Sequence, residues 1–118
     1  MGCKIEAFQQ EQKKRMRSVQ DAMDVLNGKW KIAVISSICC YGKRRFSDIL
    51  GDVAGISNRM LSKELKELEI NQLIKRTVLD THPISVQYEL TEHGNTLQTI
   101  ITSLSEWGIE HRNKIVRK

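Results

Sequence analysis

The sequence of 118 residues contains a single proline, Pro83, and only 5% aromatic residues. Because proline interrupts helices, a chain so poor in it is expected to be rich in helix. No apolar run approaches the roughly 18 residues that a membrane-spanning helix needs. No apolar block with a cleavage site follows the basic N-terminal residues, so we expect no signal peptide, no membrane association and a cytoplasmic location.

Cysteine is also scarce in this chain. There are three cysteines, an odd number, and Cys39 and Cys40 are adjacent. A disulfide between neighbours is strained, and a long-range pair leaves one cysteine over. We therefore expect no structural disulfide framework, which agrees with a reducing compartment.

The common motifs of enzymes and metal sites are absent as well. There is no Gly-rich phosphate loop, no GxSxG and no HExxH, and His82, His93 and His111 have no partner at metal-ligand spacing. The sequence shows no convergent set of titratable groups that catalysis would need. We therefore predict a protein that is not an enzyme and that carries no cofactor and no metal.

Positive charge is what the chain has in excess. Nineteen Lys and Arg face fourteen Asp and Glu, which gives a formal net charge of +5. This balance is compatible with a nucleic-acid partner, although other classes of basic protein share it. The length predicts a single domain over residues 1–118.

Hydrophobic periodicity predicts a mostly α-helical chain with one small β-hairpin. Gly28 is expected to end the early helices, Ser57 and Thr91 to cap later ones, and residues 41–45 to form a basic loop. The expected helices cover residues 4–17, 19–26, 29–40, 46–51, 58–71 and 92–113, and the expected strands cover 74–80 and 85–90. A tight helix-turn-helix followed by a hairpin is the winged helix-turn-helix arrangement.

The helix predicted over residues 58–71 has two contrasting faces. Leu61, Leu65 and Leu68 share one side, and the glutamates at 64, 67 and 69 are expected on the flanks. A helix that enters the major groove of DNA needs cations and hydrogen-bonding groups outward and leucines inward. The alternative is the solvated face of an ordinary amphipathic helix. The DNA-contacting residues expected here are Ser57, Asn58, Arg59, Ser62, Lys63 and Lys66.

Two neighbouring segments supply further candidate contacts to DNA. Arg76 lies on the incoming hairpin strand and His82 in its turn, from which a wing reaches the DNA backbone or minor groove. Arg44 and Arg45 precede a short helix, where they are placed to meet phosphates. The alternatives are an ordinary surface hairpin and a loop made soluble by its charge.

Six segments together resemble one known family. Taken in order and at their spacing, they are similar to the HxlR-type transcriptional regulators, relatives of the MarR group, and the likeness covers roughly residues 18–108. The resemblance implies a winged-helix homodimer that binds an operator in double-stranded DNA, usually as a repressor, with the reading helix at 57–70 and the wing at 74–90. The segments are Asp24–Trp30, Arg45–Ile49, Gly55–Leu61, Leu65–Glu69, Tyr88–Gly94 and Trp107–Gly108.

The two terminal helices, about 4–17 and 92–113, are the predicted dimer contacts. Both carry apolar stripes, and a two-fold dimer reads two half-sites about one DNA turn apart. The alternative is that these stripes complete the core of the single chain. The predicted interface residues are Ile5, Phe8, Leu97, Ile101, Leu104 and Trp107.

The resemblance also implies a thiol sensor, with one departure. Several family members sense oxidants through a cysteine just before the first winged-helix element, and the matching position here is about Met16. Cys3 lies well upstream, exposed near the terminus and beside Lys4, and it is our candidate if any cysteine senses. Cys39 and Cys40 are expected at a helix C-terminus, where the dipole disfavours a thiolate. We favour the alternative that all three are inert.

A second functional reading remains open. Winged helices also serve as protein-interaction modules without any DNA role, since one fold hosts several functions. Such a module predicts no salt-dependent affinity for duplex DNA, whereas an operator-binding protein predicts a strong dependence.

Overall fold

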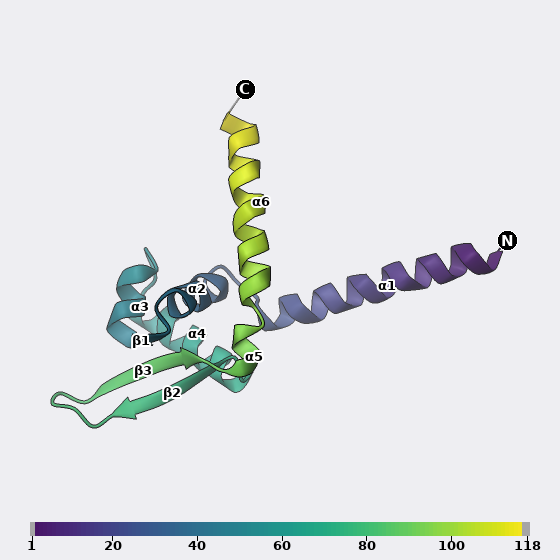
Figure 1. The fold of residues 1–118 in the computed structure, drawn as a ribbon. Helices are drawn as coiled ribbons and strands as arrows, with labels where there is room; N and C mark the ends of the chain where they lie inside the picture. Colours follow the sequence, from purple (N-terminus) through teal and green to yellow (C-terminus); the bar gives the residue numbers. More distant parts are fainter. Residues whose placement is uncertain (1, 117–118) are drawn as a thin grey trace.

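The computed structural model describes residues 2–116, and side chains from residue 4 onward. It is mostly helical with a small antiparallel sheet, so the predicted winged helix-turn-helix is confirmed (Figure 1). In chain order the elements are α1 (Gly2–Val25), α2 (Lys31–Tyr41), β1 (Lys43–Arg45), α3 (Phe46–Asp52), α4 (Asn58–Ile70), β2 (Ile74–Leu79), β3 (Ser85–Leu90), α5 (Glu92–Asn95) and α6 (Gln98–Val116).

The core lies around α2, which contacts α3, α4, α6 and the sheet. The apolar residues at helical spacing in α2, Val34, Ile35 and Ile38, are completely buried. Leu61, Leu65 and Leu68 of α4 meet them with at most 1% of their surface exposed. The leucine stripe that the sequence predicted is therefore the face by which α4 is fixed to the body.

The sheet has three strands in the order β1-β3-β2, all antiparallel. The predicted hairpin is β2–β3, paired from Ile74 opposite Leu90 to Leu79 opposite Ser85. The prediction that residues 41–45 form only a loop was wrong, because Lys43 pairs with Glu89 and Arg45 with Gln87. The open edge of β3 supplies the hydrogen-bonding partners, and no local signal in residues 43–45 reveals that edge.

The segment after the hairpin is fixed to the body by Thr91 and Gly94. The Thr91 backbone N–H donates to the Leu73 carbonyl at 3.1 Å, and its hydroxyl donates to the Gln72 carbonyl at 2.6 Å. The Thr91 hydroxyl also accepts from the Gly94 N–H at 2.9 Å, which confirms the predicted cap. A Cβ on Gly94 would lie 2.0 Å from the Leu73 carbonyl oxygen, so only glycine allows this approach.

The single final helix predicted over 92–113 is in fact two helices, α5 and α6. The chain tightens between them, where the Thr96 N–H donates to His93 and the Leu97 N–H to Gly94, each three residues back. Because α5 is fixed to the body, this turn brings Leu97 into the core with 9% exposure before α6 leaves. At the other end, the segments predicted at 4–17 and 19–26 form the one helix α1.

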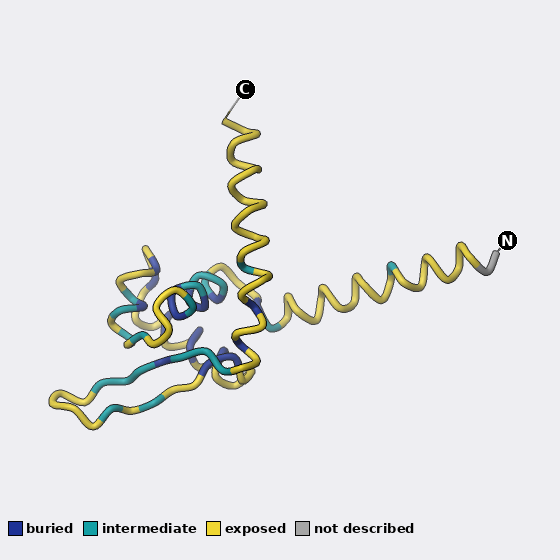
Figure 2. The backbone as a smooth tube through the Cα atoms, viewed as in Figure 1, coloured by how far each residue is buried: buried dark blue, intermediate teal, exposed yellow. Residues whose placement is uncertain are grey.

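The helices α1 and α6 project away from the body (Figure 1). The side chains of residues 4–24 are exposed apart from half-buried Gln12, and those from Thr102 to Val116 are exposed throughout (Figure 2). The radius of gyration is 18.3 Å, against about 13 Å for a compact chain of this length. Among the helices described, none combines the length and apolarity that a bilayer crossing requires.

Candidate nucleic-acid interface

The helix-turn-helix consists of α3, a turn over 53–57, and α4. Gly55 has φ +87°, a left-handed conformation that glycine adopts without steric cost. The Ser57 hydroxyl then accepts from the Met60 N–H at 3.1 Å, which confirms it as the N-cap of α4. The first turn of α4 is therefore well defined, and its unpaired N–H groups give that end a positive potential.

The outward face of α4 is polar and basic. Asn58, Arg59, Ser62, Lys63 and Lys66 are all exposed on the helix whose leucines are buried. Lys63 lies 4.0 Å from Glu67, whereas Arg59 and Lys66 make no ion pair with any residue that the structure describes. The face has cations and hydrogen-bonding groups that are available to an outside partner.

Two grooves run along the hairpin, and one of them borders this face. The first, of about 370 Å³, lies between α4 and the sheet, and its lining includes Ser62, Lys66 and Arg76. The second, of about 540 Å³, lies between the start of α3 and the hairpin tip, and its lining includes Arg45 and His82. Most of the predicted DNA-contacting residues thus lie on α4 or along these two grooves.

Arg44 differs from the other candidates because its charge has partners inside the chain. Its guanidinium donates to the Asp52 carboxylate from Nε at 3.0 Å and from Nη2 at 2.6 Å, and it lies 3.9 Å from the Tyr41 ring centroid. The hydrogen bond to Asp52 raises the pKa of Arg44. That bond, together with one from Ser37 at 2.7 Å, lowers the pKa of Asp52. Arg44 therefore links β1 to α3, whereas Arg45 is exposed.

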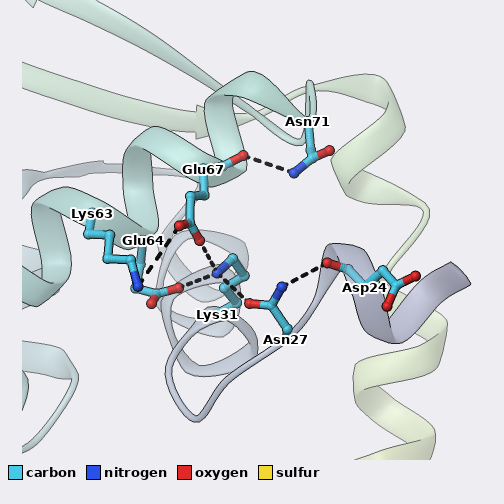
Figure 3. A network of polar contacts seen from close by, with 7 residues as sticks. All are labelled: Asp24, Asn27, Lys31, Lys63, Glu64, Glu67 and Asn71. Atoms are coloured by element: carbon cyan, nitrogen blue, oxygen red, sulfur yellow. Dashed lines mark hydrogen bonds and ion pairs between the residues drawn. The ribbon is translucent and has the colours of Figure 1, made fainter. Parts of the chain in front are cut away.

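Sequence reasoning missed a polar cluster beneath α4 (Figure 3). The Lys31 ammonium donates to Glu64 at 2.6 Å, to Asn27 at 3.1 Å and to Glu67. Lys31 is 2% and Glu64 4% exposed, so the expectation that Glu64 lies on a flank of the helix was wrong. The signal was present, because Lys31 shares the core period of Val34 and Ile38, as Glu64 does that of the α4 leucines.

The charges in this cluster stabilise one another. Burial alone lowers the pKa of Lys31, but its hydrogen bonds with Glu64 and Glu67 outweigh burial and raise it above its ordinary value. The same hydrogen bond from Lys31 lowers the pKa of Glu67. The ammonium therefore stays charged in the interior.

The predicted dimer residues divide into two groups. Phe8 and Trp107 are each 64% exposed, and Ile5 and Leu104 are also exposed. Leu97 is buried in the core of its own chain and Ile101 is half-buried against it, so neither is fully available to a partner.

The cysteines are only partly described. The side chain of Cys3, the candidate sensor, lies outside the described part of the chain. Cys39 is half-buried and Cys40 is exposed, and both are free thiols.

A helix-turn-helix with an exposed polar second helix, followed by an antiparallel hairpin, defines the winged helix-turn-helix class of DNA-binding proteins. A model of the HxlR-like helix-turn-helix family matches residues 25–116. The chain belongs to this family of helix-turn-helix transcriptional regulators, which confirms the resemblance seen in its sequence.

Relatives of known sequence are described as regulators and not as enzymes. YtcD of Bacillus subtilis (strain 168), described as an uncharacterized HTH-type transcriptional regulator, is 36% identical over 105 residues, which cover 89% of this chain and 82% of YtcD. A regulator of the same description from Methanothermobacter thermautotrophicus is 42% identical over 91 residues, covering 77% of this chain and 69% of the relative.

Solved structures of regulators share the fold. The redox regulator HypR in its reduced form is 35% identical with a TM-score of 0.77, covering 86% of this chain and 99% of HypR. The reduced form of the regulator YodB from B. subtilis is 34% identical with a TM-score of 0.67, covering 76% of this chain and 87% of YodB.

Proposed function

We propose that this protein is a cytoplasmic transcriptional repressor that binds an inverted-repeat operator in double-stranded DNA as a homodimer. The observation that carries the proposal is the division of α4 into a leucine face with at most 1% exposure and an exposed face of basic and hydrogen-bonding residues. A helix fixed in this way presents its first two turns to a major groove.

The exposed residues fall into two roles. Asn58 and Arg59 lie in the first turn of α4, where side chains reach base edges, and arginine bonds guanine bidentately while asparagine bonds adenine. Lys63 and Lys66 lie further along the helix and contact phosphates, as does Ser62 through its hydroxyl. Arg45, Arg76 and His82 extend the contact along the two grooves toward the wing.

The homodimer is supported by the exposed apolar residues of α1 and α6. Ile5, Phe8, Leu104 and Trp107 are each more than half exposed, although the His111 ring stacks on Trp107. Single chains rarely leave large apolar side chains exposed in such a series. Covering them with a second copy places two α4 helices on one duplex, and two half-sites give the affinity that a repressor needs to exclude other proteins from the same DNA.

The test uses single substitutions on an operator selected from a random duplex pool. Arg59→Ala is expected to weaken operator binding by about 1–3 kcal/mol and to relax the preference at one base position. Lys66→Ala is expected to weaken all sequences alike and to reduce the salt slope by about one. Lys114→Ala, which removes the same charge on exposed α6, is the matched control.

The combined variant Arg59→Ala, Lys63→Ala decides the docking. If it binds the operator as tightly as the parent protein, α4 is not the reading helix. If the parent protein shows no salt-dependent affinity for any duplex, the protein is an interaction module rather than a repressor.

A further inference from the structure

We propose that Lys31 is a positioning residue that fixes the rotation of α4 relative to α1 and so sets the spacing of the two reading helices in the dimer. The inference rests on the proposed function, because it gives α4 the reading role and α1 a place in the dimer. Lys31 itself touches neither DNA nor partner in this arrangement, since it is 2% exposed.

The geometry is a continuous chain of polar contacts from α1 to the exposed face of α4 (Figure 3). The Asn27 amide donates to the Asp24 carbonyl at 2.9 Å, near the end of α1. The same side chain accepts from Lys31 at 3.1 Å, and Lys31 donates onward to Glu64 and Glu67 of α4. Glu67 in turn lies 4.0 Å from Lys63 on the predicted reading face.

All three hydrogens of the Lys31 ammonium have acceptors in this arrangement, and its acceptors come from two different parts of the chain. Glu64 and Glu67 are one helical turn apart, so they contact the ammonium from the same face of α4. A rotation of α4 about its axis, or a slide along it, breaks at least one of these bonds.

Apolar packing alone does not fix that rotation as tightly. The other contacts of α4 with the core are made by its leucines and by half-buried Met60, and the hydrophobic effect is non-directional. Replacing a buried ion pair by apolar residues is often neutral for stability, so in this chain we assign the pair to fixing the arrangement of α4 rather than to raising the free energy of unfolding. Lys31 and Glu64 are the two buried charged residues in the part of the chain that the structure describes.

The decisive variant is Lys31→Met combined with Glu64→Leu. It leaves the net charge unchanged and leaves no buried charge without a partner, because half-exposed Glu67 is free to turn to water. We expect it to fold, to bind non-specific duplex as the parent does, and to lose at least about tenfold in operator affinity.

A residue with only a structural role is not expected to affect spacing selectivity, which is the loss of affinity when the distance between the two half-sites is changed. One base pair inserted between the half-sites rotates one against the other by about a tenth of a turn. The parent protein is expected to lose about tenfold or more on the lengthened operator, and the double variant less than about threefold. Equal discrimination by the two proteins overturns the proposal.

Three further variants separate positioning from stability. Glu64→Gln keeps an acceptor for Lys31 and leaves Glu67 as its counter-ion, so it retains the selectivity of the parent. Ile35→Val destabilises the same core without changing any of these polar contacts, so we expect it to keep the spacing selectivity of the parent as well. Asn27→Ala removes the exposed link in the series of polar contacts, away from the buried charges. We expect it to reduce spacing selectivity, and this test remains available if the double variant does not fold.

A measurement without DNA distinguishes failure of this inference from failure of the proposed function. Spin labels at exposed Asp21 of α1 and Ile70 of α4, in a chain with its cysteines changed to serine, report the distance between the two helices. We expect a narrow distribution in the parent and a broader one in Asn27→Ala and in the double variant. Unchanged width overturns the positioning role whatever the DNA measurements show, whereas a parent that selects no operator overturns only the proposed function.

Discussion

The winged body and its two projecting helices share the same apolar pattern but differ in how far the apolar side chains are exposed. Val34, Ile38 and Leu61 in the body are 0% exposed, whereas Phe8 on α1 and Trp107 on α6 are 64% exposed. Both groups recur at helical spacing, so periodicity identifies an apolar face without saying which chain covers it. The core of the body is thus covered within one chain, whereas the exposed apolar residues of α1 and α6 are the ones that the proposed homodimer would cover.

The pattern along α1 supports this conclusion. Ile5, Phe8, Met16, Val19 and Met23 lie within about a quarter of the helix circumference, and all are exposed. Most helical stability in proteins comes from packing an amphipathic face, and a solvated helix of ordinary composition is marginal in water. A 24-residue helix with an uncovered stripe is therefore expected to depend on a second copy of the chain.

The largest expected effect comes from shortening a buried side chain of α4. Leu65→Ala removes a side chain that is 1% exposed and leaves a cavity beneath α4, which should lower the free energy of unfolding by about 2–5 kcal/mol. Leu104→Ala makes the same chemical change at a side chain that is 51% exposed, and should cost the single chain less than about 0.5 kcal/mol. Urea unfolding at low protein concentration measures the free energy of unfolding of both variants. Equal losses would contradict the distinction between the covered and the exposed apolar faces.

The next effect is on association. Trp107→Ala removes the largest exposed aromatic of α6, and an interface residue of this kind costs about 2 kcal/mol or more, which is about 30-fold in the dimer dissociation constant. Sedimentation equilibrium across micromolar concentrations measures the shift. Val78→Ala, at a 53% exposed site on the hairpin, is the matched control and should leave the constant unchanged. A parent protein of 13.6 kDa under these conditions refutes the dimer.

Local signals predicted much of the body. The leucines of α4, the caps at Ser57 and Thr91 and the hairpin strands follow from spacing and from residue chemistry close in sequence. The break between α5 and α6 could not be predicted in this way, because it depends on Gly94 packing against Leu73 across the fold. Strand β1 was missed for the same reason, since its partner β3 lies far along the chain.

The candidate site shows the same limit. The exposed face of α4 was predicted from its helical wheel, and the structure leaves those residues exposed. The internal pairing of Arg44 with Asp52 was not predicted, because an arginine in a basic segment resembles a phosphate contact until its neighbour in space is known. Lys31 and Glu64 lie at core positions of the helical repeat, and two opposite charges in such positions indicate a buried ion pair.

A smaller effect concerns glycine on the uncovered face. Gly108 lies inside α6 with no atom near the position of an added Cβ, so Gly108→Ala should stabilise the single chain by about 0.5–1 kcal/mol. It follows Trp107 on the apolar side of α6, where a methyl group would obstruct a closely packed partner helix, so the same change should weaken the dimer. Asn113→Ala, on the opposite side of the helix, is the control. Stronger association of Gly108→Ala would place the interface elsewhere.

The body should also show an acid-sensitive component. Hydrogen bonds from Arg44 and from Lys31 lower the pKa values of Asp52 and Glu67, whose ordinary values are 3.8 and 4.5. A carboxyl group with a lowered folded pKa stabilises the fold above its unfolded value and loses that contribution as pH falls through the folded value. The free energy of unfolding should therefore be nearly constant from pH 7 to about pH 5 and fall below it. Asp52→Asn should reduce this decrease in the free energy of unfolding. Glu11→Gln on α1 is the control for the removal of a negative charge.

The smallest expected effect concerns the thiols, and it tests whether α1 carries more than dimer contacts. The cysteine position implied by the family is occupied here by Met16. We therefore expect mild diamide treatment to change operator affinity by less than about twofold, which is no more than the effect of an ordinary surface substitution. An electrophoretic shift titration before and after treatment measures it. A larger change that disappears in Cys3→Ser would place a sensor on α1, whereas one that persists there and disappears in Cys40→Ser would place it at the exposed end of α2. In either case the thiolate adds to the N=N bond of diamide, and a second thiol then displaces the hydrazine to give a disulfide. Mass spectrometry of the treated protein without reductant therefore identifies the cysteine independently of DNA binding.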